Sequence, residues 1–162
     1  MRQDANTPPM GEPLAYFLTW TTYGTWLPGD ERGWVKRPGS LEEANPRLER
    51  WSRSKLAERA LILAPGQRAI VERTIVDHCR IRGWHLWIVR CLSNHVHVVI
   101  TARDVDPDGV VRQLKAWCTR RLKEADAAEE ARVHWWTERA STRYINDRNG
   151  LEGAILYVRD AQ

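Results

Sequence analysis

The segment 93–101, SNHVHVVIT, alternates histidine with β-branched residues, and this alternation constrains the fold more than any other feature of the chain. A period of two is typical of a β-strand, in which successive side chains point to opposite faces of the sheet. One face receives three apolar residues that are expected in the core, namely Val96, Val98 and Ile100. His95 and His97 then share the opposite face, about 6 to 7 Å apart along the strand.

Two imidazoles on one strand face are the donors of a candidate metal site. Imidazole binds Mn²⁺, Co²⁺, Ni²⁺ and Zn²⁺, and a site completed by oxygen donors from water and phosphate also accepts Mg²⁺. The alternative is that His95 and His97 are solvent-facing residues of a half-exposed strand. Asn94, which starts the strand with a polar group, and the apolar run after the histidines favour the metal site.

Periodicity along the rest of the chain predicts the other regular elements. Alternating or β-branched runs predict strands over residues 14–22, 84–92, 95–102 and part of 132–147. Apolar residues at helical spacing predict helices over residues 67–82, from Asp106 onward and over 151–158. A long loop follows the first strand, and residues 41–64 are expected to be irregular with one short helix.

This order of elements predicts the fold class. Two helices interleaved with about four strands are typical of an α+β protein, here a ferredoxin-like α/β sandwich. We expect an antiparallel sheet with helices on one face and a C-terminal helix that carries a tyrosine. The other face of the sheet, with the two histidines, is then available for a ligand.

Length and composition indicate one cytoplasmic domain. The 162 residues fit a single domain over residues 1–162, with a flexible polar tail over residues 1–13. No run of about 18 apolar residues suggests a membrane partner, and the N-terminus lacks the pattern of a secretion signal. The three cysteines lack zinc-site spacing and lie in apolar patterns, which predicts reduced core residues at Cys79, Cys91 and Cys118.

Charge and aromatic content indicate a nucleic-acid partner. The net charge is +4, and the chain has nine tryptophans, whose rings stack on unpaired bases. Trp26 and Trp34, in the long loop, are candidate stacking residues. The helix after Asp106 has an apolar stripe and a basic face, whose candidate phosphate contacts are Arg112, Lys115, Arg120, Arg121 and Lys123. A merely solvated basic face is the alternative.

Several of these segments resemble those of a known family. NHVHVVI with the preceding WHLWIVRCLS, the basic helix VVRQLKAWCTRRL and the ending AILYVRDAQ are similar to the single-tyrosine HUH transposases, in particular the REP-associated tyrosine transposases. The likeness runs from about Tyr16 to Gln162, and YFLTWTTYGTWLPGDERGWV is similar to the N-terminal strand and loop of that branch. The whole chain would then be one HUH transposase-like domain.

The resemblance implies a catalytic tyrosine and a metal site. His95 and His97 match the two metal-binding histidines of the family, and Tyr157 matches its nucleophile on the last helix. Helical geometry places Tyr157 about 100° from the centre of the apolar stripe of that helix, at its flank. Tyr144, close to the same helix, is the competing tyrosine.

The third protein ligand departs from the family pattern. A glutamine one helical turn after the tyrosine helps to bind the metal in that family, but Ala161 occupies this place here. Gln162 is therefore the first choice for the third ligand, and Asp160 is the second. The implied cofactor is a divalent metal ion, Mg²⁺ or Mn²⁺.

The resemblance implies a metal-dependent endonuclease and strand transferase that acts on single-stranded or hairpin DNA through a 5′-phosphotyrosine. Relatives exist in paired and solitary forms, so a homodimer and a monomer are both open. Two other functions also stay open. One is a non-catalytic protein that binds structured nucleic acid, and the other is a metal-dependent nuclease that uses an activated water.

Overall fold

A computed structural model describes residues 11–36 and 40–162 of the chain. The strands are β1 (Ala15–Thr21), β2 (Trp34–Lys36), β3 (Ser40–Glu42), β4 (His85–Cys91), β5 (His95–Thr101) and β6 (Ser141–Ile145). The helices are α1 (Pro46–Ser54), α2 (Pro65–Arg82), α3 (Pro107–Ala125) and α4 (Arg148–Arg159), with a short 3₁₀ turn at Ala127–Glu129. Most of the tail expected over residues 1–13 lies outside the described residues.

The main sheet joins four strands in the order β4-β5-β1-β6, and every neighbouring pair is antiparallel. Helix α2 connects β1 to β4, and α3 connects β5 to β6. Each connection therefore crosses over one intervening strand, as in the split βαβ units of ferredoxin-like folds. The predicted α+β class and the sheet of about four strands are confirmed.

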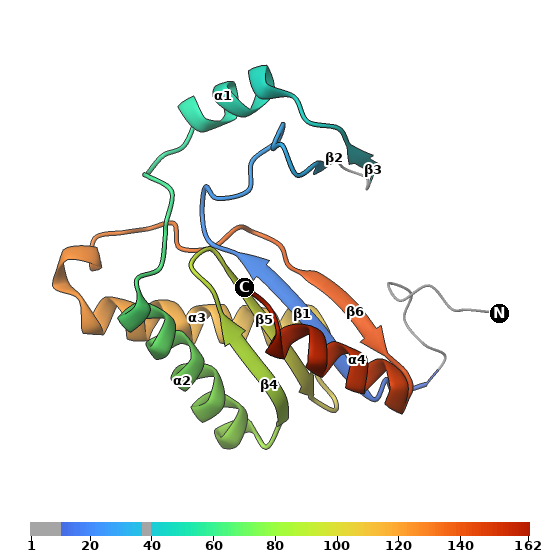
Figure 1. Ribbon diagram of the computed structural model, residues 1–162. Coiled ribbons are helices and arrows are strands. Elements are labelled where there is room, and N and C mark those ends of the chain that lie inside the picture. Colours follow the sequence, from blue (N-terminus) through green and yellow to red (C-terminus); the bar gives the residue numbers. More distant parts are fainter. Residues whose placement is uncertain (1–10, 37–39) are drawn as a thin grey trace.

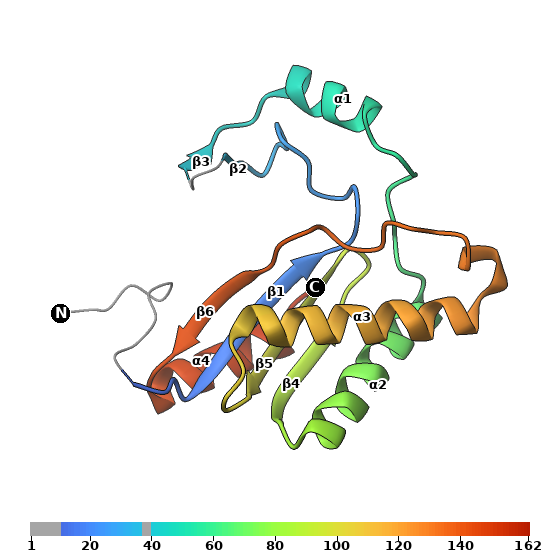
Figure 2. The ribbon, with the colours of Figure 1, turned by 180° about the vertical axis from the view of Figure 1, so that it is seen from behind.

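Helices cover both faces of this sheet. Figure 1 shows α4 in front of the sheet, and Figure 2, from behind, shows α2 and α3 on the opposite face. α2 and α3 pack against each other, and α4 packs against β4, β5 and β6. The face that the sequence left available for a ligand is therefore partly covered by the helix that carries Tyr157.

The alternation of β5 separates two hydrophobic clusters. Val96, Val98 and Ile100 belong to the larger cluster, which fills the space between the sheet and the helices α2 and α3. Val99, from the other face of the strand, belongs to a smaller cluster under α4, together with Ala15, Phe17, Ile145, Leu151 and Val158. The prediction that the first three residues enter the core is confirmed.

Local capping fixes where the long helices begin and end. The side chain of Asp106 accepts a hydrogen bond from the backbone N–H of Gly109 at the start of α3, and Pro107 fits the first turn. Asp147 caps α4 in the same way. Gly83 ends α2 with a positive φ of 70°, a conformation that glycine adopts without strain. Asp106, Pro107 and Gly83 are the start and stop signals that the sequence offers for α3 and α2, whereas α4 begins three residues before the predicted Leu151.

The segment between β1 and α2 lies apart from the sheet, at the top of Figure 1, and contains the β2–β3 hairpin and α1. The short helix was predicted, but the hairpin was not, because three-residue strands among glycine and proline give no alternating run. Backbone hydrogen bonds tie the returning segment to the core at Leu61 N to Tyr23 O (2.9 Å) and Leu63 N to Ser93 O (2.7 Å).

Two further predictions concern the environment of the protein. Cys79, Cys91 and Cys118 are free and buried, as expected for core residues. Over residues 11–36 and 40–162, no helix is both long enough and apolar enough to cross a membrane. Cytoplasmic location stays a prediction.

Candidate active site

β5 presents His95 and His97 on the sheet face that α4 covers. The antiparallel register places Thr19 of β1 opposite His97, and Thr21 opposite His95. The two imidazole rings are adjacent, with centroids 4.6 Å apart and planes at 80°. The alternation of the strand thus brings the two candidate ligands together, as the sequence predicted.

A hydrogen bond at Nδ1 orients each imidazole. His97 Nδ1 lies 2.8 Å from Thr19 Oγ1, and His95 Nδ1 lies 2.6 Å from the side-chain oxygen of Asn94. Because an amide oxygen only accepts, His95 carries its proton on Nδ1, and Nε2 keeps its lone pair. Metal-binding histidines are commonly held in this way, with one nitrogen fixed by a polar neighbour and the other free for the ion.

Burial keeps both imidazoles neutral. His97 is only 6% exposed, and burial, together with the adjacent His95, lowers its pKa to about 4. Burial also lowers the pKa of His95, with a smaller contribution from the positive charge of Arg32. Neutral imidazole is the form that binds metal ions, so neither ring has to lose a proton at pH 7 before it binds a cation.

Tyr157 of α4 lies beside these histidines. Its ring centroid is 5.8 Å from that of His97 and 5.8 Å from that of Phe17, edge-on in both cases. The side chain is nevertheless 63% exposed, so the phenol is open to a ligand. This is the flank position predicted from helical geometry. Phe17 also contacts His97, at 5.7 Å, and so packs against both rings.

The other three tyrosines of the chain lie elsewhere. Tyr144 packs edge-on against Tyr16, and both belong to the cluster on the α2 and α3 face of the sheet. The hydroxyl of Tyr23 accepts a hydrogen bond from the backbone of Ala57, and its ring stacks on His134. The sheet therefore separates the competing Tyr144 from the two histidines.

A pocket of about 400 Å³ connects the histidines to the end of α4. Its lining consists of His95, His97, Leu156, Tyr157, Asp160, Ala161 and Gln162. Both carboxylate oxygens of Asp160 accept hydrogen bonds from Arg159, at 2.8 and 3.1 Å. Arg159 also lowers the pKa of Asp160. Both candidates for the third ligand thus line the pocket, but Asp160 already has a cationic partner.

The donor set fits a divalent cation that keeps other oxygen ligands. Two neutral imidazoles, each held at Nδ1, lie side by side at an open pocket. Among residues 11–36 and 40–162, no three side chains of His, Cys, Asp or Glu gather into a metal-binding group. The remaining ligands would therefore be oxygens of Gln162, water or phosphate, which are donors that Mg²⁺ and Mn²⁺ accept.

The predicted DNA contacts of α3 do not lie with this site. α3 covers the opposite face of the sheet, so its cations Arg112, Lys115, Arg120, Arg121 and Lys123 lie beyond the sheet from Tyr157. Arg120 and Arg121 pair with Glu124, at 3.2 and 2.8 Å. The ammonium of Lys115 donates to the carbonyl oxygens of Thr137 (2.7 Å) and Arg139 (3.4 Å). Their contact with phosphate stays a prediction.

The two loop tryptophans differ in their surroundings. Trp26 is exposed, its indole N–H donates to the Gly33 carbonyl at 2.8 Å, and the Arg32 guanidinium lies 4.6 Å from its ring centroid. The indole N–H of Trp34 donates to the Glu43 carbonyl at 3.1 Å, and both residues lie in the segment between β1 and α2. Stacking of either ring on a base stays a prediction.

Sequence reasoning missed Thr19 and Arg32. Thr19 shares the parity of Phe17 on β1, but only the pairing register shows that it faces His97. Arg32 lies in a segment rich in glycine and charge, where no periodicity indicates a partner. The Thr19 contact joins distant parts of the chain, whereas the contacts of Arg32 are local but lie in a segment whose pattern does not indicate them.

Comparison with known proteins supports the fold. No protein-family model matches the chain, and no curated protein matches it. A REP-associated tyrosine transposase bound to a REP hairpin aligns with 98% of this chain and 70% of its own, with a TM-score of 0.55 and 14% identity. A Deinococcus radiodurans R1 protein provisionally classed as a transposase aligns with 99% of this chain and 97% of its own, with a TM-score of 0.54 and 13% identity. The resemblance seen in the sequence is thus confirmed at the level of the fold.

Proposed function

We propose that this protein cleaves and rejoins single-stranded DNA, with Tyr157 as the nucleophile and a divalent metal ion bound by His95 and His97. The contact between Tyr157 and His97 carries this proposal. A phenol from α4 and an imidazole from β5 meet at an open pocket, with ring centroids 5.8 Å apart. The fold shared with a tyrosine transposase supports the same interpretation.

In the proposed reaction, the Tyr157 oxygen, having lost its proton, attacks a backbone phosphorus atom. The new oxygen–phosphorus bond forms while the bond from phosphorus to the 3′ oxygen breaks, and the leaving 3′ oxygen takes up a proton. The 5′ phosphate stays on Tyr157. Attack by a 3′ hydroxyl reverses the step and joins the strands, so the exchange needs no external energy source.

A divalent ion held by the two histidines and an oxygen donor such as Gln162 would supply charge neutralisation at a nonbridging phosphate oxygen. The residues of the chain prepare the site for this. Thr19 and Asn94 fix the two imidazoles through Nδ1. Phe17 packs against both His97 and Tyr157, and so keeps the phenol beside the metal-binding face.

Hairpin-forming single-stranded DNA is the proposed substrate. The similar transposase is bound to a REP hairpin, and the net charge of +4 suits an anionic partner. The cations of α3 lie on the other face of the sheet, so a DNA molecule that reaches Tyr157 contacts them only by passing around a sheet edge. We therefore propose these cations as secondary DNA contacts. The protein would act as a monomer or a homodimer.

The test is a covalent trapping experiment. Hairpin oligonucleotides with single-stranded flanks of random sequence are incubated with the protein and Mn²⁺ or Mg²⁺, then separated on a denaturing gel. We expect a protein–DNA band that retains a 3′ label and lacks a 5′ label, and that EDTA abolishes. Tyr157→Phe should remove the band and keep DNA binding. Tyr144→Phe, on the other sheet face, is the matched control and should keep both.

The other two functions give different outcomes in the same experiment. A nuclease that uses an activated water would still cleave DNA after Tyr157→Phe and would form no covalent band. A protein that only binds structured nucleic acid would show neither cleavage nor a band in any variant. Either outcome contradicts the proposal.

A further inference from the structure

Arg32 is held in one orientation by three different acceptor atoms. Its Nε donates to Asp30 Oδ1 at 2.7 Å, and its Nη2 donates to Asp30 Oδ2 at 2.6 Å and to the Thr25 carbonyl at 2.7 Å. The side chain of Asp30 is 8% exposed, whereas that of Arg32 is 44% exposed. The carboxylate is therefore the buried support, and the guanidinium is the group presented to solvent.

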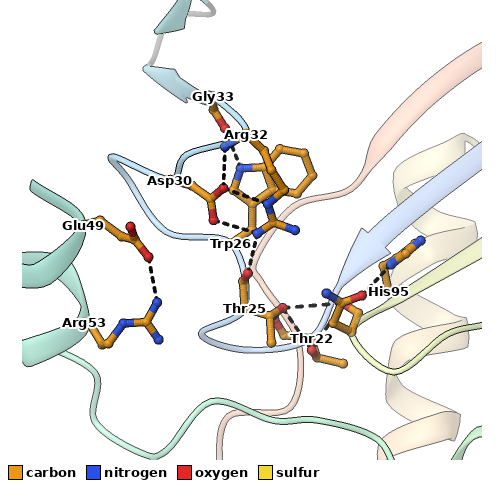
Figure 3. Close-up of polar contacts among 10 residues, drawn as sticks. Thr22, Thr25, Trp26, Asp30, Arg32, Gly33, Glu49, Arg53 and His95 are labelled. Carbon is orange, nitrogen blue, oxygen red and sulfur yellow. Dashed lines mark hydrogen bonds and ion pairs between the residues drawn. The ribbon is translucent and has the colours of Figure 1, made fainter. Parts of the chain in front are cut away.

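The ring of Trp26 lies against the Arg32 guanidinium. The Arg32 guanidinium lies 4.6 Å from its ring centroid, and the Trp26 N–H is fixed on the Gly33 carbonyl. The other cation–ring contacts among the described residues are longer, from 5.2 to 5.8 Å. Figure 3 shows Arg32 with Asp30 and Trp26 around it. A cation and an aromatic plane are thus fixed together.

A chain of hydrogen bonds attaches this feature to the candidate active site. The Thr25 hydroxyl donates to the Thr22 carbonyl at 2.8 Å, and Thr22 N donates to the Asn94 carbonyl at 2.9 Å. The Asn94 side chain in turn bonds to His95 Nδ1. In Figure 3, Thr25 and Thr22 lie between Arg32 and His95.

We propose that Arg32 and Trp26 form a nucleotide subsite for single-stranded DNA, next to the phosphate that Tyr157 attacks. Arg32 binds the neighbouring backbone phosphate, and the exposed Trp26 ring stacks on the base of that nucleotide. This inference rests on the proposed function, because it takes the substrate to be DNA bound at His95 and Tyr157. It assigns Asp30 as a positioning residue that acts through Arg32.

The geometry favours a phosphate ligand over a purely structural role for Arg32. Asp30 and Thr25 occupy Nε and Nη2, and within residues 11–36 and 40–162 no hydrogen bond uses Nη1. Arginine is suited to phosphate because its donors lie in one rigid plane. A guanidinium that is already ordered loses little entropy when it binds, so its contact is stronger than that of a free surface arginine. Aromatic stacking on bases adds affinity without sequence preference.

The test measures binding of a labelled oligothymidylate of about 20 nucleotides by fluorescence anisotropy. All variants carry Tyr157→Phe, so binding is read without cleavage. Asp30→Asn keeps the arginine, and Asp30→Asn with Arg32→Gln removes it without leaving a buried carboxylate unpaired. Relative to Asp30→Asn, the double substitution should weaken binding about tenfold and lower the slope of log affinity against log salt by about 0.7. Arg80→Ala, which removes an arginine paired with Asp77 on α2, should change neither.

Two further variants keep the inference falsifiable if the double substitution unfolds the loop. Arg32→Lys retains the charge and can still reach Asp30, but it loses the planar donors. It should weaken binding severalfold with little change in salt slope. Trp26→Leu should weaken binding about tenfold with an unchanged slope, because stacking does not depend on ion release. Thermal unfolding of each variant shows which ones remain folded.

The outcomes separate this inference from the proposed function. Folded Arg32 and Trp26 variants that bind like Arg80→Ala would overturn the subsite and leave covalent cleavage by the unsubstituted protein intact. Binding that depends on Arg32, in a protein that never forms a covalent band, would overturn the cleavage and support a nucleotide-binding surface. A protein that binds no single-stranded DNA would overturn both.

Discussion

The two faces of the sheet are built by the same strands and differ in almost every property. On the α2 and α3 face, β5 contributes Val96, Val98 and Ile100, none of which has any exposed surface. On the α4 face, the same strand contributes His95 and His97, next to a small cluster and an open pocket. One face is a closed apolar layer, and the other combines a minor core with polar side chains and an exposed phenol.

This difference shows how a small domain can separate its main core from a candidate active site. Because successive side chains of a strand point to opposite faces of the sheet, neighbouring residues can lie in the core and at the candidate site in turn. The larger core removes more apolar surface from water and therefore contributes most of the stability. The smaller core under α4 leaves room at the pocket for neutral imidazoles and a tyrosine. Substitutions on the α2 and α3 face should therefore change mainly the free energy of unfolding, and those on the α4 face mainly metal binding and cleavage.

The largest effect is expected from removal of the imidazoles. His95→Ala with His97→Ala should reduce covalent cleavage by about 1,000-fold or more, because charge neutralisation at the phosphate is worth several kcal/mol. It should also abolish binding of Mn²⁺ measured by isothermal titration calorimetry. A control that removes two other histidines, His85→Ala with His134→Ala, should preserve both. Normal Mn²⁺ binding by the first variant would show that the metal binds elsewhere.

Truncation of one leucine on each face gives the next largest contrast. Leu114 of α3 has no exposed surface, so Leu114→Ala should lower the free energy of unfolding by about 3 kcal/mol. Leu156 of α4 is 48% exposed, and Leu156→Ala should cost under about 1 kcal/mol. Urea denaturation measures both. If Leu114→Ala abolished cleavage in the fraction that stays folded, the two faces would not be independent.

Two threonines on the α4 face should differ in their effect on metal affinity, by a smaller amount than in the preceding comparisons. Thr19→Val removes the hydroxyl that bonds to His97 Nδ1 and nearly preserves the shape, so it should weaken metal binding about 10- to 100-fold. Thr21, two residues along the same strand, bonds to Thr137 through its hydroxyl, so Thr21→Val is the matched control. Equal metal affinities for the two variants would indicate that the Thr19 hydrogen bond does not orient the ligand.

The sequence predicted those parts of the site that depend on local periodicity. The pairing of His95 with His97 on one face follows from alternation in β5, and the flank position of Tyr157 follows from helical geometry. Neither requires knowledge of the neighbouring elements. The order of helices and strands likewise predicted the fold class, because caps and apolar periods are local signals.

Features that depend on long-range contacts were not predictable in this way. The sheet register places Thr19 against His97, and it is fixed by packing along the whole of β1 and β5. Arg32 and Asp30 are only two residues apart, and their contact was missed for another reason, because the segment has no periodicity. Lys115 resembles the other cations of α3 in the sequence, yet it alone among them donates to the carbonyls of Thr137 and Arg139.

Lys115, a partly buried cation on the α2 and α3 face, provides the smallest predicted effect. Burial lowers the pKa of Lys115 from 10.5 to about 8. Between these values the folded protein has released the proton and the unfolded chain still holds it, so raising the pH through this window stabilises the folded state. Solvent still reaches this side chain, which limits the gain to about 1 kcal/mol.

Comparison with Lys115→Met isolates this effect from other titrations. Burial raises the pKa of the thiols of Cys79 and Cys91, to about 11 and about 12, and these groups destabilise the folded state as the pH rises above 9. They are present in both proteins, so their contribution cancels in the difference between the unfolding free energies. That difference, measured by urea denaturation, should move by about 1 kcal/mol in favour of the unsubstituted protein between pH 7.5 and pH 10. A difference that stays constant would mean that the Lys115 ammonium is solvated in the folded state, and would leave it free to bind phosphate as the sequence predicted.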